Sequence, residues 1–254
     1  DGAYCIGLGM TAREQLLSFL AKAADPNSGG RQMPQHYGHK DLRIVSQSSP
    51  TGTQFLQAVG CAMVCKMGKT KEVVYVSAGE GTTSQGDFHE ALNWASNAKA
   101  PVIFHIQDNE YAISTHRSEQ TASSIYDMTS GYGNLSRYDV DGTDFFETSL
   151  AFKEAVQRSR INKGPSIIVS HVVRLLPHSS SDDQRKYRDE KSLNNDLKKD
   201  PLLILESKCI DTKFIKADEF AKIRLQVDKD VDIDSAWAEE QDFPEPETAM
   251  DHIY

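Results

Sequence analysis

The sequence lacks any apolar run near the ~20 residues that a membrane-spanning helix requires, which excludes a membrane protein. Cysteine is scarce, and its four copies (Cys5, Cys61, Cys65 and Cys209) form no CxxC pair and no dense cluster. This spacing indicates free thiols in a reducing compartment rather than a disulfide framework. An excess of positive charge is also missing, because the formal net charge is −9. We therefore expect no nonspecific binding to nucleic acid.

Internal repeats, a signal peptide and an initiator methionine are absent as well, and we expect further residues before Asp1. What is present suits a folded globular protein, since 39% of the 254 residues are hydrophobic and 26% are charged. This size is typical of one α/β domain with appended helices.

Apolar strands alternate with helical segments through the middle of the chain. The segments VVYVSAG (residues 73–79), PVIFHIQDN (101–109) and PSIIVSHVV (165–173) predict buried strands. The intervening segments 87–99 and 149–160 predict helices. This order favours a three-layer α/β fold whose mostly parallel sheet is covered on both faces. We expect the α/β domain over residues 1–200 and a helical or irregular tail over residues 201–254.

Polar residues follow two of the predicted strands directly. Gly79, Glu80 and Gly81 end the first strand, where the glycines let the backbone approach a phosphate. Asn109 follows the next strand, 29 residues after Glu80. The carboxylate of Glu80, the amide oxygen of Asn109 and the backbone carbonyl of Tyr111 would form an all-oxygen set suited to Mg²⁺. An ordinary turn is the alternative interpretation of the GEG triplet.

The spacing from GEG to DN resembles the thiamine-diphosphate binding pattern. The wider chain resembles the α portion of a branched-chain 2-oxo acid dehydrogenase, the decarboxylating component of a multienzyme complex. Five sequence blocks between about residues 29 and 190 carry this resemblance: GRQMPQHYG, SQSSPTGTQFLQAVGCA, GEGTTSQGDFHEALNWA, DNEYAIST and HSSSDDQRKYR.

The resemblance implies a cofactor site with assigned residues. Mg²⁺ would be held by Glu80, Asn109 and the Tyr111 carbonyl. Thiamine diphosphate would be surrounded by Ser49, Thr51, Gly79, Gly81, Thr82, Ala112, Ile113 and His178. A potassium-binding loop in some relatives corresponds to Ser48, Pro50, Thr53 and Gln54.

His178 is the expected catalytic residue. An imidazole at this position could steady the diphosphate or take part in acyl transfer to a lipoyl group. The alternative is that His178, one of eight histidines, is only solvated. Downstream side chains should order this loop through hydrogen bonds and ion pairs, namely Asp182, Asp183, Tyr187 and Arg188.

The implied reaction is oxidative decarboxylation of a branched 2-oxo acid such as 2-oxoisovalerate, with acyl transfer to the lipoyl group of an acyltransferase partner. A β subunit or fused β domain would complete the site, and the location would be cytoplasmic, or the mitochondrial matrix in a eukaryote. One alternative is a pyruvate or acetoin dehydrogenase component. The other is a non-catalytic nucleotide-binding or scaffolding relative, which Gln107 and Asp108 favour because they depart from the family pattern.

Overall fold

The computed structural model describes residues 2–251. The chain forms two compact units, Asp1–Ser49 with Ile215–Tyr254, and Pro50–Phe214. These units differ from the predicted division into residues 1–200 and 201–254. The predicted division assigns cofactor binding to residues 1–200, and this assignment stays a prediction.

A four-stranded parallel sheet forms the centre of unit Pro50–Phe214. Its spatial order is β1 (Val74–Gly79), β2 (Val102–Asp108), β6 (Ser166–His171) and β5 (Ser136–Asp141). All three pairings are parallel, as the alternation of strands and helices predicts. Gly79 lies opposite Gln107, and Asp108 lies opposite His171. The strands therefore end together along one edge of the sheet.

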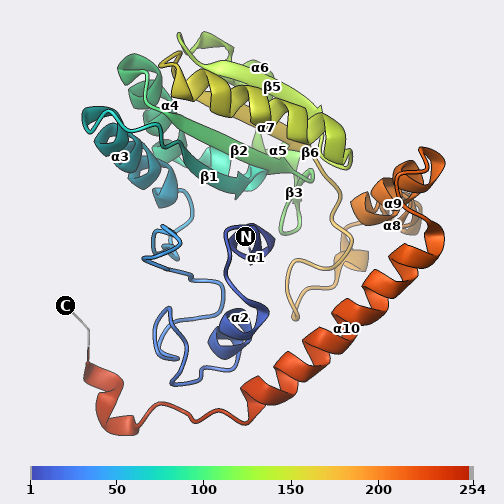
Figure 1. Ribbon diagram of the computed structural model, residues 1–254. Coiled ribbons are helices and arrows are strands. Elements are labelled where there is room, and N and C mark those ends of the chain that lie inside the picture. The colour runs from blue at the N-terminus through green and yellow to red at the C-terminus, as the bar shows by residue number, and fades with distance from the viewer. Residues whose placement is uncertain (1, 252–254) are drawn as a thin grey trace. The chain divides into compact units, whose positions relative to one another are not determined.

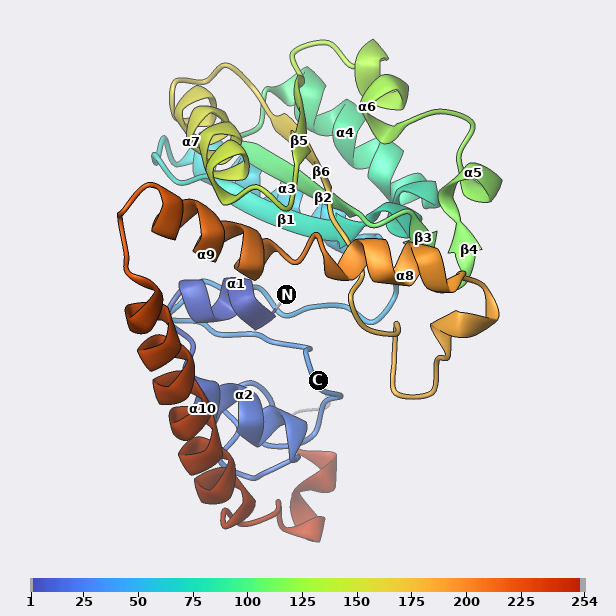
Figure 2. The ribbon, with the colours of Figure 1, turned by 90° about the vertical axis from the view of Figure 1, so that its right-hand side faces the viewer.

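Helices cover both faces of this sheet and make it three-layered (Figure 1). On one face, α3 (Thr53–Met67) and α4 (Gly86–Ala98) share a core with alternate residues of β2, including Phe104 and Ile106. On the other face, α7 (Phe145–Arg160) packs through Ala151 and Ala155 against Ile103 and Ile168. Figure 2 shows α4 and α7 on opposite sides of the strands.

Short elements connect the layers of this unit. Between β1 and β5 lie, besides α4 and β2, the short elements η1 (Glu80–Ser84), β3 (Tyr111–Ala112), β4 (Thr115–His116), α5 (Arg117–Gln120), α6 (Ile125–Met128) and η2 (Thr129–Gly131). After β6 come η3 (Gln184–Lys186), α8 (Glu190–Leu197) and α9 (Pro201–Asp211). β3 and β4 form a small antiparallel hairpin.

The other unit contains α1 (Gly2–Gly7), α2 (Ala12–Phe19), α10 (Ala217–Glu239) and η4 (Pro246–Met250). Thr11 and Glu14 form a capping box at the start of α2. Arg13 of α2 forms an ion pair with Asp234 of α10, with 2.6 Å between Nε and Oδ1. Among residues 2–251, no helix is long and apolar enough to cross a membrane.

Candidate functional site

The carboxyl edge of the sheet brings Glu80 and Asn109 together. Glu80 begins η1 directly after β1, and Asn109 follows the last residue of β2. The backbone N–H of Asn109 donates to Oε2 of Glu80 at 3.2 Å. This contact follows from the pairing of β1 with β2, because parallel neighbours end at the same edge.

The other carboxylate oxygen of Glu80 is available for a ligand. Glu80 is 2% exposed, and its buried Oε1 has no hydrogen-bond partner within residues 2–251. Burial raises the pKa of the Glu80 carboxyl, and the negative charge of Asp108 acts in the same direction. A buried, unpartnered carboxylate oxygen is costly unless a cation or proton compensates it. The side chain therefore fits a divalent cation.

The turn from Asn109 to Tyr111 carries the other two predicted oxygen ligands. Oδ1 of Asn109 accepts from the backbone N–H of Tyr111 at 3.1 Å. The turn then leads into the β3–β4 hairpin, in which Tyr111 pairs with His116. The described residues hold no cluster of three or more His, Cys, Asp or Glu that could bind a metal. A metal at this edge would thus require the amide and backbone oxygens.

Close backbone approaches bring the predicted cofactor residues near one another. A Cβ placed on Gly81 would lie 2.7 Å from Cβ of Ala112, so only glycine fits this approach. Gly52 has φ +100°, and a Cβ there would lie 2.9 Å from Cβ of Gln85. The loop of Thr51 and Gly52 therefore meets the end of η1, beside Thr82.

The loop before α3 contains the predicted potassium ligands of this unit. Oγ1 of Thr53 donates to the Pro50 carbonyl at 3.0 Å, and Oε1 of Gln54 accepts from the Gly52 N–H at 2.9 Å. Their oxygens thus stabilise the loop itself. Ser48 and Ser49 belong to the other compact unit, where Oγ of Ser49 lies 2.6 Å from Nε2 of His36.

His178 lies in the segment after β6, and its side chain is exposed. Its backbone N–H donates to Oδ2 of Asp182 at 2.9 Å, and the Tyr187 hydroxyl donates to the same oxygen at 2.6 Å. The Tyr187 hydrogen bond is the main cause that lowers the pKa of Asp182. Asp183 instead pairs with Arg185 at 2.8 Å. Asp182, Asp183 and Tyr187 thus make hydrogen bonds and an ion pair within the segment, and their ordering role stays a prediction.

Arg174 links this segment to the hairpin, and sequence reasoning missed it. Its guanidinium donates to the Ile113 carbonyl and to the Tyr187 hydroxyl, each at 2.7 Å. The Tyr111 ring lies 5.5 Å from the Arg174 guanidinium carbon and 5.1 Å from that of Arg188. A basic residue directly after a buried strand was the only sequence signal for this role.

A model of one protein family, described as the dehydrogenase E1 component, matches residues 2–247. The chain belongs to this family. It is 41% identical over its whole length to the 2-oxoisovalerate dehydrogenase subunit alpha of Bacillus subtilis, and the match covers 77% of that protein.

Two further relatives match a smaller part of this E1 chain. The mitochondrial 2-oxoisovalerate dehydrogenase subunit alpha of Homo sapiens is 42% identical over 65% of this chain and 37% of its own length. The corresponding subunit of Pseudomonas aeruginosa is 35% identical over 76% of this chain and 47% of its own. The chain thus spans less than half the length of these two relatives. The predicted family and fold class are confirmed, whereas the roles of individual residues stay predictions.

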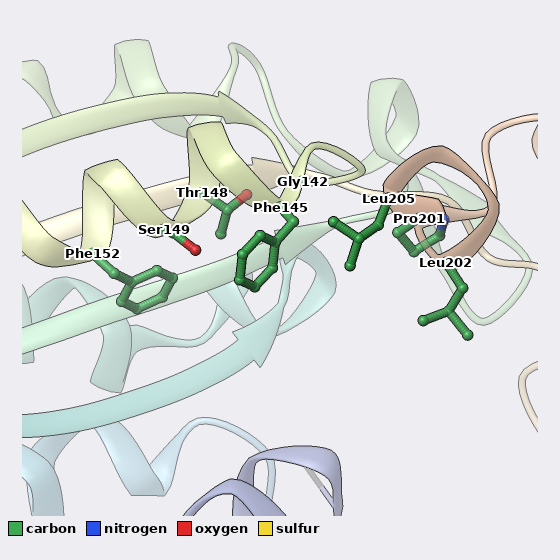
Figure 3. A pocket seen from close by; sticks show the side chains of 8 residues that line it. All are labelled: Gly142, Phe145, Thr148, Ser149, Phe152, Pro201, Leu202 and Leu205. Atoms are coloured by element: carbon green, nitrogen blue, oxygen red, sulfur yellow. The ribbon is translucent and has the colours of Figure 1, made fainter. Parts of the chain in front are cut away.

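Two cavities of the E1 chain lie apart from the Glu80–Asn109 edge. One of about 450 Å³ lies between α7 and α9 (Figure 3) and includes none of the predicted site residues. Its lining residues are Gly142, Phe145, Thr148, Ser149, Phe152, Pro201, Leu202 and Leu205. This mostly apolar lining contains no cationic side chain that would pair with a diphosphate. The other, of about 540 Å³, is lined by part of the His178 segment, from Ser180 to Arg185, and by α8.

Proposed function

We propose that this chain is the α portion of a thiamine-diphosphate-dependent dehydrogenase that decarboxylates a branched-chain 2-oxo acid such as 2-oxoisovalerate. The observation that carries the proposal is the buried, unpartnered Glu80 carboxylate oxygen beside Asn109, in a chain of the E1 family. The names of the relatives support the branched-chain substrate.

In this proposal Mg²⁺ is held by the Glu80 carboxylate, the Asn109 amide oxygen and the Tyr111 carbonyl. The described geometry supports this set, because Glu80 and Asn109 are in direct contact and Tyr111 is two residues further on. The cofactor itself would supply the carbon nucleophile and the electron sink for decarboxylation. The residues around it would be Ser49, Thr51, Gly79, Gly81, Thr82, Ala112, Ile113 and His178.

The residues of this chain would bind and orient rather than perform the carbon chemistry. Backbone amides of the GEG segment would bind phosphate oxygens, since glycine lets them approach closely. The exposed imidazole of His178 could hold a proton near the diphosphate or deliver one during acyl transfer. The hydrogen bond from its backbone N–H to Asp182 would hold the backbone of His178 in place.

Partners are part of the same proposal. A β subunit or fused β domain would complete the cofactor site, and a lipoyl-bearing acyltransferase would accept the acyl group. Potassium would bind at Ser48, Pro50, Thr53 and Gln54. The cellular location would be the cytoplasm, or the mitochondrial matrix in a eukaryote. A component acting on pyruvate or acetoin is a second candidate, because the same fold accommodates a different substrate pocket.

The test is turnover of a panel of 2-oxo acids by the chain produced together with its β partner. We expect turnover with branched substrates that depends on thiamine diphosphate and Mg²⁺. Preference for pyruvate would favour the second candidate. Failure to bind thiamine diphosphate would favour a non-catalytic relative, which the departures at Gln107 and Asp108 also suggest.

A further inference from the structure

A buried ion pair lies directly beside the proposed metal-binding turn. Asp108, the last residue of β2, is 1% exposed and precedes Asn109. Its Oδ1 accepts from the backbone N–H of Glu110 at 3.0 Å, and its Oδ2 accepts from the guanidinium of Arg117. Both oxygens of this buried carboxylate are therefore engaged by the turn that follows it.

Arg117 contacts the same turn from its other end. It begins α5 after the hairpin, and its backbone N–H donates to the Glu110 carbonyl at 2.7 Å. A second guanidinium nitrogen lies 3.5 Å from the Glu110 carboxylate. The segment from Asp108 to Arg117 is thus closed into a loop by side-chain and backbone contacts between its two ends.

The backbone inside this loop needs such support. Glu110 has φ +68° and Ile113 has φ +57°, a left-handed region that residues with a Cβ rarely adopt. Conformations of this kind persist only where the surroundings over-determine them. Asn109 and Tyr111, the proposed oxygen ligands, lie on either side of Glu110. A relaxed turn would therefore displace both ligands together.

Arg117 also compensates the negative charge of Asp108 near Glu80. Without Arg117, Asp108 would be a second negative charge near Glu80, and a buried charge without its partner is strongly unfavourable. His171 also faces Asp108, at 3.8 Å between Nδ1 and Oδ2, but its other ring nitrogen contacts Asp139 at 2.7 Å. Arg117 is accordingly the nearer partner of the Asp108 charge.

We propose that Asp108 and Arg117 form a positioning pair that fixes the turn presenting Asn109 and Tyr111 to Mg²⁺. The inference rests on the proposed function, since it concerns the same metal site. Neither residue contacts the metal. Both act through the turn.

The test is a double-mutant cycle on the chain produced with its β partner. The variants are Asp108→Asn, Arg117→Met and the double substitution. The readout is the Mg²⁺ concentration that gives half-maximal binding of thiamine diphosphate, measured by calorimetry. We expect about a tenfold increase in this concentration for each single variant and no further increase in the double variant, because the pair acts as a unit.

Two controls separate positioning from general stability. Lys208→Met breaks the ion pair of Lys208 with Asp144, away from the turn, and should lower the melting temperature without changing the Mg²⁺ requirement. Arg117→Lys retains the charge and should restore part of the wild-type Mg²⁺ affinity. An unchanged Mg²⁺ requirement in both single variants, or effects that add in the double variant, would overturn the inference. If the wild-type complex itself binds no thiamine diphosphate with Mg²⁺, the proposed function fails, and the inference fails with it.

Discussion

Among single residues, Glu80 meets two opposing requirements. Its burial favours the neutral acid, whereas a metal ligand must be charged. Glu80→Gln retains the size and removes the charge. We expect it to weaken Mg²⁺-dependent binding of thiamine diphosphate by about 100-fold or more, since changes even to outer-shell partners cost roughly 10- to 100-fold. Calorimetry on the complex with the β partner measures this.

Without Mg²⁺, by contrast, we expect Glu80→Gln not to destabilise the protein. Because the glutamine carries no buried charge, the melting temperature of the metal-free protein should stay equal or rise. Glu90→Gln, on the exposed face of α4, is the matched control and should change neither quantity. A Glu80→Gln protein with wild-type affinity for the cofactor would show that the metal is held elsewhere.

His105 predicts a separate pH dependence. It lies buried in β2, where its ring nitrogens are 2.9 Å from the Tyr75 hydroxyl and the Ser170 hydroxyl, and burial lowers its pKa to about 4. The unfolded chain takes up this proton near pH 6.5. The free energy of unfolding should therefore fall as the pH drops from about 6.5 to about 4, by at most ~3 kcal/mol. Denaturant unfolding of wild type and His105→Gln should show a shallower decline in the variant, and parallel declines would refute the assignment.

Between elements, Arg174 couples the segment after β6 to the β3–β4 hairpin. Arg174→Met removes its hydrogen bonds to Ile113 and Tyr187, so the segment should open more often. We expect faster trypsin cleavage at Arg185 and Lys186, measured on the complex with the β partner. Arg160→Met, which removes the hydrogen bond from Arg160 at the end of α7 to the Lys71 carbonyl, is the control and should leave this rate unchanged.

Binding of the cofactor should protect the same segment. Its polar composition buries little apolar surface, so a negatively charged ligand near His178 would add a contact that favours the ordered state. Trypsin cleavage between Arg174 and Arg188 should therefore slow when thiamine diphosphate and Mg²⁺ are added. Equal rates under both conditions would contradict this coupling.

Strands β1, β2 and β6 and the Glu80–Asn109 contact were predictable because each depends on a local pattern and on parallel pairing. The length of α10 was not. The sequence predicts only a helical or irregular tail over residues 201–254, whereas α10 runs from Ala217 through many acidic residues to Glu239. Lys222 pairs with Asp218 at 2.9 Å, and Gln226 donates to Asp230 at 2.8 Å. Such contacts one turn apart support a polar helix that apolar periodicity does not reveal. Arg174 escaped prediction because its partner, Ile113, is 61 residues away in sequence.

For the whole molecule, the decisive feature is that the proposed site draws on a partner. In the proposed function a β subunit or fused β domain completes the cofactor site, so this chain alone should catalyse no decarboxylation. Adding the β partner should restore turnover, and the Glu80→Gln chain added in the same way should not. The measurement is CO₂ release from 2-oxoisovalerate with thiamine diphosphate and Mg²⁺ present. Robust release by the isolated chain would refute the shared site, because a site completed by a second chain cannot turn over without it.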